Sequence, residues 1–212
     1  FTLFGERFAD HVKLVPLTPW YRFQFADGDT FDYGGTLEAT LAEIERIEPR
    51  DRAGYLALLE HSRRIYDIGF TQLSAQPFDR FGTMLRQVPH LLGLRNYETV
   101  WQMVSRHLVS DKLRRAFSIQ PLLVGGNPFD TTSIYGLIHF LERAYGVHFA
   151  MGGTGAVTQA LGGLMERQGI ALRLSTTVER VRIEQGVARG VVLADGTHVD
   201  ADIVVSDADA AH

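Results

Sequence analysis

Residues 147–169, VHFAMGGTGAVTQALGGLMERQG, carry the clearest signal of the fold class. It begins with a short strand pattern, passes through the turn Gly152–Gly155, and continues as a helix with apolar residues on one face. Gly169 is placed to end that helix, because glycine readily adopts the left-handed conformation of a helix C-terminus. A strand, a glycine-rich turn and a helix in this order are typical of a mixed α/β fold.

The glycine-rich turn is a weak ligand signal by itself. Glycines let a backbone approach a ligand, and a helix N-terminus favours an anion. The dinucleotide fingerprint, however, would need a small residue where Thr158 stands, and a phosphate-binding loop would need a lysine after the glycines. The residues alone therefore favour a plain tight turn over a ligand loop.

After this helix the pattern changes to β structure. The expected segments are a strand near 171–174 and three β segments at 178–184, 187–193 and 197–206. Gln185-Gly186 and Asp195-Gly196 supply the turns, and the third segment is expected to break near Asp200. Asp207 and Asp209 follow the last segment, where a carboxylate either faces a ligand crevice or begins a solvated loop. Both interpretations stay open.

Near the start of the chain, residues 20–33 predict a β-hairpin. Aromatic and polar residues alternate on both sides of Asp27-Gly28, a dipeptide typical of hairpin turns. One face of the hairpin would carry five aromatic rings, those of Tyr21, Phe23, Phe25, Phe31 and Tyr33. This face is interpreted first as part of the core, with the wall of an apolar ligand cavity as the alternative.

Residues 36–145 have the spacing of amphipathic helices. Thr36 is a candidate cap for the first helix, and Pro49–Asp51 ends that helix and is a candidate cap for the second. Gly125–Pro128 interrupts the later helices. Further helices are expected near 79–93, 98–108 and 111–120 and from Ile134 to Tyr145. The predicted division is a hairpin and helical region at 1–145 and a strand, helix and meander region at 146–212.

The composition excludes several function classes. The chain has 212 residues, 45% of them hydrophobic and 22% charged, as in a folded domain. Its net charge of −4 excludes a broadly basic nucleic-acid binder, so no nucleic-acid partner is expected. The absence of cysteine excludes a disulfide framework and a cysteine nucleophile. The eight histidines show no metal-ligand spacing, and His139 is interpreted as a structural histidine.

Several motifs, spread in order over most of the chain, resemble the bacterial phytoene desaturase family of FAD-dependent carotenoid desaturases. They are Val15–Pro19 with Tyr21-Arg22, Pro49–Asp51 with Gly54-Tyr55, Leu122–Phe129 with Thr132–Tyr135, Gly152–Ala156, and Val204–Asp209. The resemblance implies a partial FAD-binding, Rossmann-like domain of the glutathione-reductase type, together with a β-hairpin and helical substrate domain. Residues 1–145 would form the substrate-binding, helical and membrane-associating region. Residues 146–212 would form a second segment of the discontinuous FAD-binding domain, the part to which the chain comes back after that region. Because the family's N-terminal Gly-x-Gly-x-x-Gly loop is absent, we expect an internal fragment that is inactive by itself.

The resemblance also implies a set of site residues. Val178 is expected near the adenine end of FAD. The other expected cofactor contacts are Ser206, Asp207, Ala208 and Asp209 at the adenosine-diphosphate half, and Gly152, Gly153 and Thr154 beside the cavity nearer the flavin. Arg86 and Thr83 are the candidate catalytic residues. Arg86 is the candidate polar site residue, with an ordinary surface arginine as the alternative, and Thr83 stands where many members carry an acid. Asp207 stands where the family usually has asparagine, which adds a charge near the phosphates, and Ala150 stands where a proline is frequent.

The activity that the resemblance implies is desaturation of a phytoene-like polyene by hydride transfer to a flavin, with FAD as the cofactor. The apolar substrate implies a peripheral position on the cytoplasmic face of a membrane. Residues 83–94 are the candidate membrane contact, with ordinary helix core as the alternative. A related flavoprotein (carotenoid isomerase, retinol saturase or amine oxidase) and a non-enzymatic lipid-binding module of the same fold stay open as alternatives.

Overall fold

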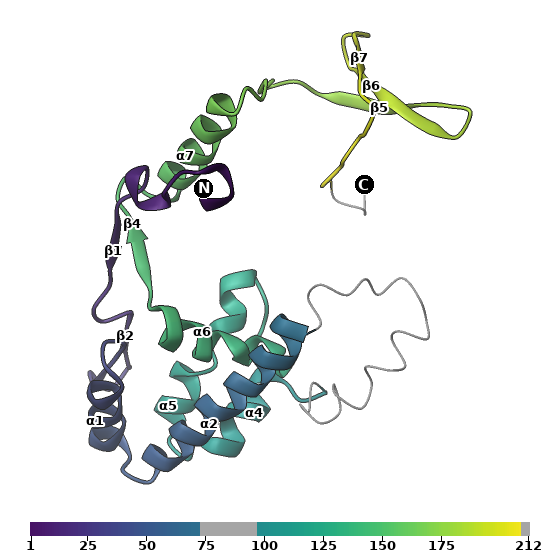
Figure 1. Cartoon of the computed structure of the whole chain (residues 1–212). Coiled ribbons are helices and arrows are strands. Elements are labelled where there is room, and N and C mark those ends of the chain that lie inside the picture. Colours follow the sequence, from purple (N-terminus) through teal and green to yellow (C-terminus); the bar gives the residue numbers. More distant parts are fainter. Residues whose placement is uncertain (73–96, 209–212) are drawn as a thin grey trace. The chain divides into compact units, whose positions relative to one another are not determined.

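The computed structural model describes residues 1–72 and 97–208 and contains both helices and sheets (Figure 1). The chain forms two compact units. The helical unit is Lys13–Gly153, and the sheet unit is Phe1–Val12 together with the residues from Thr154 onward. The predicted assignment of functions to 1–145 and 146–212 stays a prediction.

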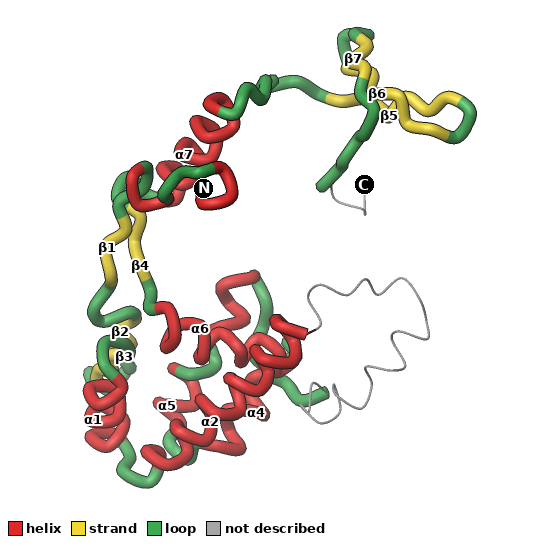
Figure 2. The backbone as a smooth tube through the Cα atoms, in the orientation of Figure 1, coloured by secondary structure: helices red, strands yellow, loops and turns green. Residues whose placement is uncertain are grey.

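A two-stranded ribbon joins the two ends of the helical unit. Strand β1 (Leu14–Pro16) pairs antiparallel with β4 (His148–Ala150). The Met151 amide extends the pairing by donating to the Lys13 carbonyl at 2.9 Å. Figure 2 shows this ribbon where the chain enters and leaves the unit. The helical unit is therefore an insertion whose first and last segments are hydrogen-bonded to each other.

The predicted hairpin is confirmed. Strand β2 (Tyr21–Gln24) pairs with β3 (Thr30–Tyr33), and the turn between them contains Gly28 with φ of +84°. Phe31 and Tyr33 are fully buried, and the other three aromatic rings of the hairpin pack partly buried against the same core. The interpretation of the aromatic face as core is therefore confirmed.

The described helices of this unit follow the predicted pattern with shorter bounds. They are α1 (Leu37–Ile47), α2 (Asp51–Ile65), the π-helical η3 (Tyr66–Gln72), α4 (Val100–His107), α5 (Asp111–Ala116), the 3₁₀ helices η4 (Gln120–Val124) and η5 (Ser133–Gly136), and α6 (Leu137–Tyr145). Thr36 caps α1 by accepting a hydrogen bond from the Ala39 amide, as predicted. The helix expected near 79–93 lies outside the described residues. No helix within 1–72 and 97–208 is long and apolar enough to cross a membrane.

Helix α2 is central to the core because it packs against both α4 and α6. The buried apolar side chains come from the hairpin and from four of the helices. They include Phe31, Tyr33, Leu41, Ile44, Tyr55, Leu58, Ile65, Val100, Met103, Val104, Leu113 and Phe117. The core thus joins residues up to 86 positions apart in the chain, from Phe31 of the hairpin to Phe117 at the end of α5.

The position of the predicted cap for α2, within Pro49–Asp51, is confirmed, but no side chain of this segment caps the helix. Arg50 occupies the N-cap position of α2 without a side-chain cap. The fully buried Asp51 carboxylate instead accepts hydrogen bonds from the Val109 amide at 2.6 Å and the Ser110 amide at 2.9 Å. The reason is that a buried carboxylate takes the donors that tertiary packing brings to it, here at the start of α5.

We expect Asp51→Ala to lower the free energy of unfolding by about 2–3 kcal/mol, because two charge-assisted hydrogen bonds to backbone amides are lost together. Urea denaturation followed by circular dichroism measures the change. Asp111→Ala is the matched control, since Asp111 pairs with Arg115 on the surface of α5 and should contribute under about 1 kcal/mol. Equal effects of the two substitutions would contradict the assignment.

The sheet unit contains α7 (Thr154–Arg167) and an antiparallel meander in the order β5 (Val178–Glu184), β6 (Val187–Leu193) and β7 (His198–Asp200). Gln185 and Gly186, with φ of 51° and 78°, form the tight turn between β5 and β6. The predicted bounds of β5 and β6 and the break near Asp200 are confirmed. Gly169, with φ of 76°, follows α7 as predicted.

The strand predicted near 171–174 is wrong. These residues have no strand assignment and are exposed. A β-strand needs a hydrogen-bonded neighbour, and in the described part of the chain the meander contains only β5, β6 and β7. The apolar pattern of 171–174 therefore has no partner strand in the described residues. Residues 201–206 likewise continue β7 without forming strand.

Candidate functional site

The turn at Gly152–Thr154 connects β4 to α7, as the sequence predicts. Gly152 and Gly153 have φ of 89° and 83°, and the Gly153 amide donates to the Ala150 carbonyl at 2.9 Å. A β-carbon on Gly153 would meet no atom within 4 Å. Glycine is required there by the backbone conformation rather than by packing among the described residues. The exposed Thr154 begins α7, where free backbone amides favour an anion.

The other predicted cofactor residues lie in the sheet unit. Val178 is the first residue of β5, is paired with Leu193 and is 50% exposed. Ser206, Asp207 and Ala208 are exposed in an irregular segment after β7. In that segment the Ala208 amide donates to the Ser206 hydroxyl at 3.3 Å. Among the described residues no hydrogen bond joins Val178 to residues 206–208.

Four predictions lie outside the described residues. They concern Arg86, Thr83, Asp209 and the candidate membrane contact at 83–94.

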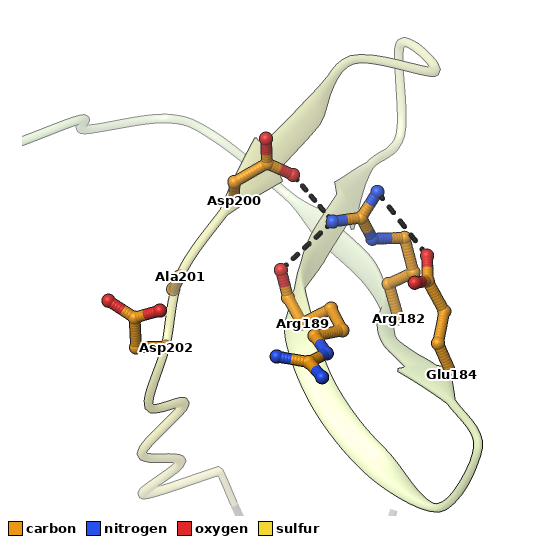
Figure 3. Close-up of a pocket in the computed structure, with 6 residues that line it drawn as sticks. All are labelled: Arg182, Glu184, Arg189, Asp200, Ala201 and Asp202. Carbon is orange, nitrogen blue, oxygen red and sulfur yellow. Dashed lines mark hydrogen bonds and ion pairs between the residues drawn. The ribbon is translucent and has the colours of Figure 1, made fainter.

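The meander carries a polar pocket that sequence reasoning missed (Figure 3). It is lined by Arg182, Glu184, Arg189, Asp200, Ala201 and Asp202. The guanidinium of Arg182 on β5 donates to the Arg189 carbonyl on β6 at 3.0 Å and to the Asp200 carboxylate on β7 at 2.5 Å. Because one side chain ties three strands together, we interpret the pocket as an ion network that holds the meander. None of the predicted cofactor residues lines it.

A buried polar cluster in the helical unit was also missed. Glu142 on α6 is 6% exposed, and it accepts a hydrogen bond from the Tyr21 hydroxyl at 2.8 Å. Burial raises the pKa of Glu142 to about 6, against the lowering effect of the Tyr21 hydrogen bond. His139, one turn earlier, is fully buried, as expected of a structural histidine. Burial lowers the pKa of His139 to about 4, so the ring is neutral near pH 7.

Arg143 extends the polar cluster toward the hairpin. Its guanidinium donates to the Gly35 carbonyl at 2.8 Å, the Thr40 hydroxyl at 2.9 Å and the Tyr55 hydroxyl at 3.2 Å. It also lies 4.6 Å from the centre of the Trp20 ring. The sequence offers only one signal for this cluster, the adjacent charged residues Glu142 and Arg143 in the amphipathic helix α6. Within residues 1–72 and 97–208, no group of three or more His, Asp or Glu side chains could hold a metal ion.

Comparison with known proteins identifies relatives of this chain. No family model matches it. It is 43% identical over 209 residues to the lycopene-forming phytoene desaturase of Pseudescherichia vulneris, covering 99% of this chain and 42% of that protein. It is 38% identical over 212 residues to the lycopene-forming enzyme of Pantoea ananas, covering 100% of this chain and 43% of the relative.

A neurosporene-forming phytoene desaturase of Cereibacter sphaeroides is 36% identical over 208 residues, covering 98% of this chain and 40% of the relative. The chain therefore spans about two fifths of the length of these curated relatives. The similarity runs through both structural units rather than through one motif, which confirms the resemblance inferred from the residues. The chain is thus similar to phytoene desaturases over 98–100% of its own length.

Proposed function

We propose that this chain is part of an FAD-dependent oxidoreductase that desaturates a phytoene-like polyene in carotenoid biosynthesis. The observation that carries the proposal is the 43% identity to a phytoene desaturase over 99% of the chain. When bound, FAD supplies the acceptor for the hydride that leaves the polyene. The residues of this chain would bind and orient the two molecules and exclude water.

The residues assigned to FAD suit a dinucleotide in their chemistry. The open backbone at Gly153 leaves room for a ligand to approach, and the first amides of α7 favour a negatively charged group. The Ser206 hydroxyl can donate a hydrogen bond. The exposed Asp207 carboxylate repels phosphate and accepts hydrogen bonds, so within the adenosine-diphosphate half it suits the ribose hydroxyls.

The sheet unit is proposed to be the later chain segment of a discontinuous, Rossmann-like FAD-binding domain. A helix followed by a three-stranded meander supports this assignment, and so does the exposure of its apolar side chains. The most exposed of these are Leu3, Leu174, Ile183, Ile203 and Val205. A three-stranded sheet with so little buried apolar surface does not hold a stable fold by itself. We propose that this unit packs against further chain in the complete enzyme.

The helical unit is proposed as the substrate region, acting at the cytoplasmic face of a membrane. A long polyene partitions into lipid, so an enzyme that draws it from a bilayer works at the bilayer surface. The buried aromatic face of β2 and β3 is core and not a cavity wall, so the substrate would meet other surfaces of this unit.

The test uses the complete protein that contains this segment, with phytoene as the substrate. We expect a yellow protein with bound-flavin absorption bands and a longer-conjugated product. Gly153→Ala should weaken flavin binding about tenfold, because it strains the turn beside the cofactor. Gly169→Ala is the matched control, since Gly169 has φ of 76° and equally open surroundings at the other end of α7.

A colourless, folded protein that stays colourless with added FAD would overturn the proposal and favour a lipid-binding module. A flavoprotein that converts phytoene into no desaturated product would point to one of the related flavoproteins instead. Equal flavin binding by the two glycine variants would remove Gly153 from the site.

A further inference from the structure

We propose that Glu142 operates a proton-controlled latch between α6 and the hairpin of β2 and β3. With a neutral carboxyl group the hairpin stays closed on α6, and with an ionised carboxylate it opens more readily. This inference rests on the helical unit alone and is independent of the proposed activity.

The position of Glu142 carries the inference. Its side chain is 94% buried, and among the described residues it forms no ion pair. Its hydrogen bond from Tyr21 spans 121 positions in the chain and joins α6 directly to β2. Tyr21 in turn stacks on Tyr33 across the hairpin, with ring centres 6.2 Å apart. The carboxyl group therefore lies between α6 and the element whose attachment it would control.

The surroundings of Glu142 favour its neutral form. The groups that face it are Tyr21 on β2, Tyr33 on β3, Tyr55 on α2, Gln120 on η4 and Arg143 beside it on α6. Only Arg143 is charged, and its guanidinium is hydrogen-bonded to Gly35, Thr40 and Tyr55 rather than to Glu142. His139, on the same helix, stays neutral above about pH 4. The loss of hydration in this setting outweighs the hydrogen bonds that stabilise the carboxylate.

The direction of the effect follows from the two protonation equilibria. In the closed state the pKa of Glu142 is about 6, and in an opened, hydrated state it returns to its ordinary value of 4.5. Below pH 4.5 both states hold the proton, and the latch has its full strength. Between pH 4.5 and 6 the open state loses the proton first, so opening becomes more favourable as the pH rises. The total change from well below pH 4.5 is roughly 30-fold, at tenfold for each pKa unit, and it is nearly complete by about pH 7.

Hydrogen exchange of the backbone amides in β2 and β3 measures this opening in the complete protein that contains this segment, with β5 and β6 as the internal reference. After correction for intrinsic exchange, we expect hairpin opening to increase roughly 15-fold from pH 4.5 to pH 7, because half of the open state is already ionised at pH 4.5. Glu142→Gln should abolish the step, because its amide keeps an acceptor for Tyr21 but does not ionise. Glu38→Gln, an exposed Glu to Gln change on α1, is the matched control and should leave the step intact.

Tyr21→Phe provides a second, independent readout. It removes the hydrogen bond that lowers the pKa of Glu142, so the midpoint of the step should move to higher pH. A step that persists in Glu142→Gln, or a wild-type profile without a step, would overturn the latch. If Glu142→Gln does not fold, the tyrosine variant decides, because an unchanged midpoint would then exclude Glu142 as the titrating group.

Discussion

Gly54→Ala is expected to destabilise the helical unit by about 3 kcal/mol, although alanine is the better helix former in an exposed helix by about 1 kcal/mol. Gly54 lies in α2 against the end of α4. A β-carbon at this position would overlap the His107 carbonyl oxygen and contact the Leu108 side chain. The overlapping atom belongs to the backbone of a helix end, so it cannot move away by a rotamer change. The packed helices themselves would have to separate.

Urea denaturation followed by tryptophan fluorescence measures this change, because both tryptophans, Trp20 and Trp101, lie in the helical unit. Gly69→Ala is the matched control in the same unit. A β-carbon at Gly69 would meet the Ile134 side chain at 3.8 Å, an ordinary contact. We expect this control to be neutral or slightly stabilising. If Gly54→Ala behaved like the control, the close approach of α2 and α4 would be wrong.

Arg143→Met is expected to lower the free energy of unfolding by about 3 kcal/mol. Methionine keeps the length and much of the apolar volume of the side chain but removes every donor. The Gly35 carbonyl, the Thr40 hydroxyl and the Tyr55 hydroxyl would each lose a hydrogen-bond donor, and the ring of Trp20 would lose its stacked cation. These groups connect α6 to the loop after β3, to α1 and to α2, so their loss should loosen the whole unit.

Two comparison variants separate the contribution of the positive charge from that of the buried hydrogen bonds. Arg143→Lys keeps the positive charge but loses the planar fork that reaches three acceptors, so we expect about 2 kcal/mol of destabilisation. Arg63→Met removes an exposed arginine that pairs with Glu60 and Asp67 on α2 and η3, and it should change stability by less than about 1 kcal/mol. An equal effect at Arg63 and Arg143 would show that the buried hydrogen bonds contribute little.

Features with a local cause can be predicted from the sequence alone. Asp27-Gly28 and Gln185-Gly186 predict their hairpins because the turn and the alternating strands that it joins are adjacent in the chain. Thr36 predicts the start of α1 because its partner is the Ala39 amide, three residues away. The Gly152–Thr154 turn was predicted for the same reason. The family, too, could be read from short motifs, each of them continuous in the sequence.

Features that depend on partners far along the chain follow from tertiary packing. Asp51 binds amides 58 and 59 residues away, and Glu142 is buried against Tyr21, 121 residues away. Residues 171–174 have an apolar strand-like pattern, yet they form no strand, because strand formation needs a neighbour that the local pattern does not specify. Hydrogen bonds and burial stabilise contacts between residues that are far apart in the sequence. The structural roles of these residues therefore depend on tertiary packing rather than on their neighbours in the chain.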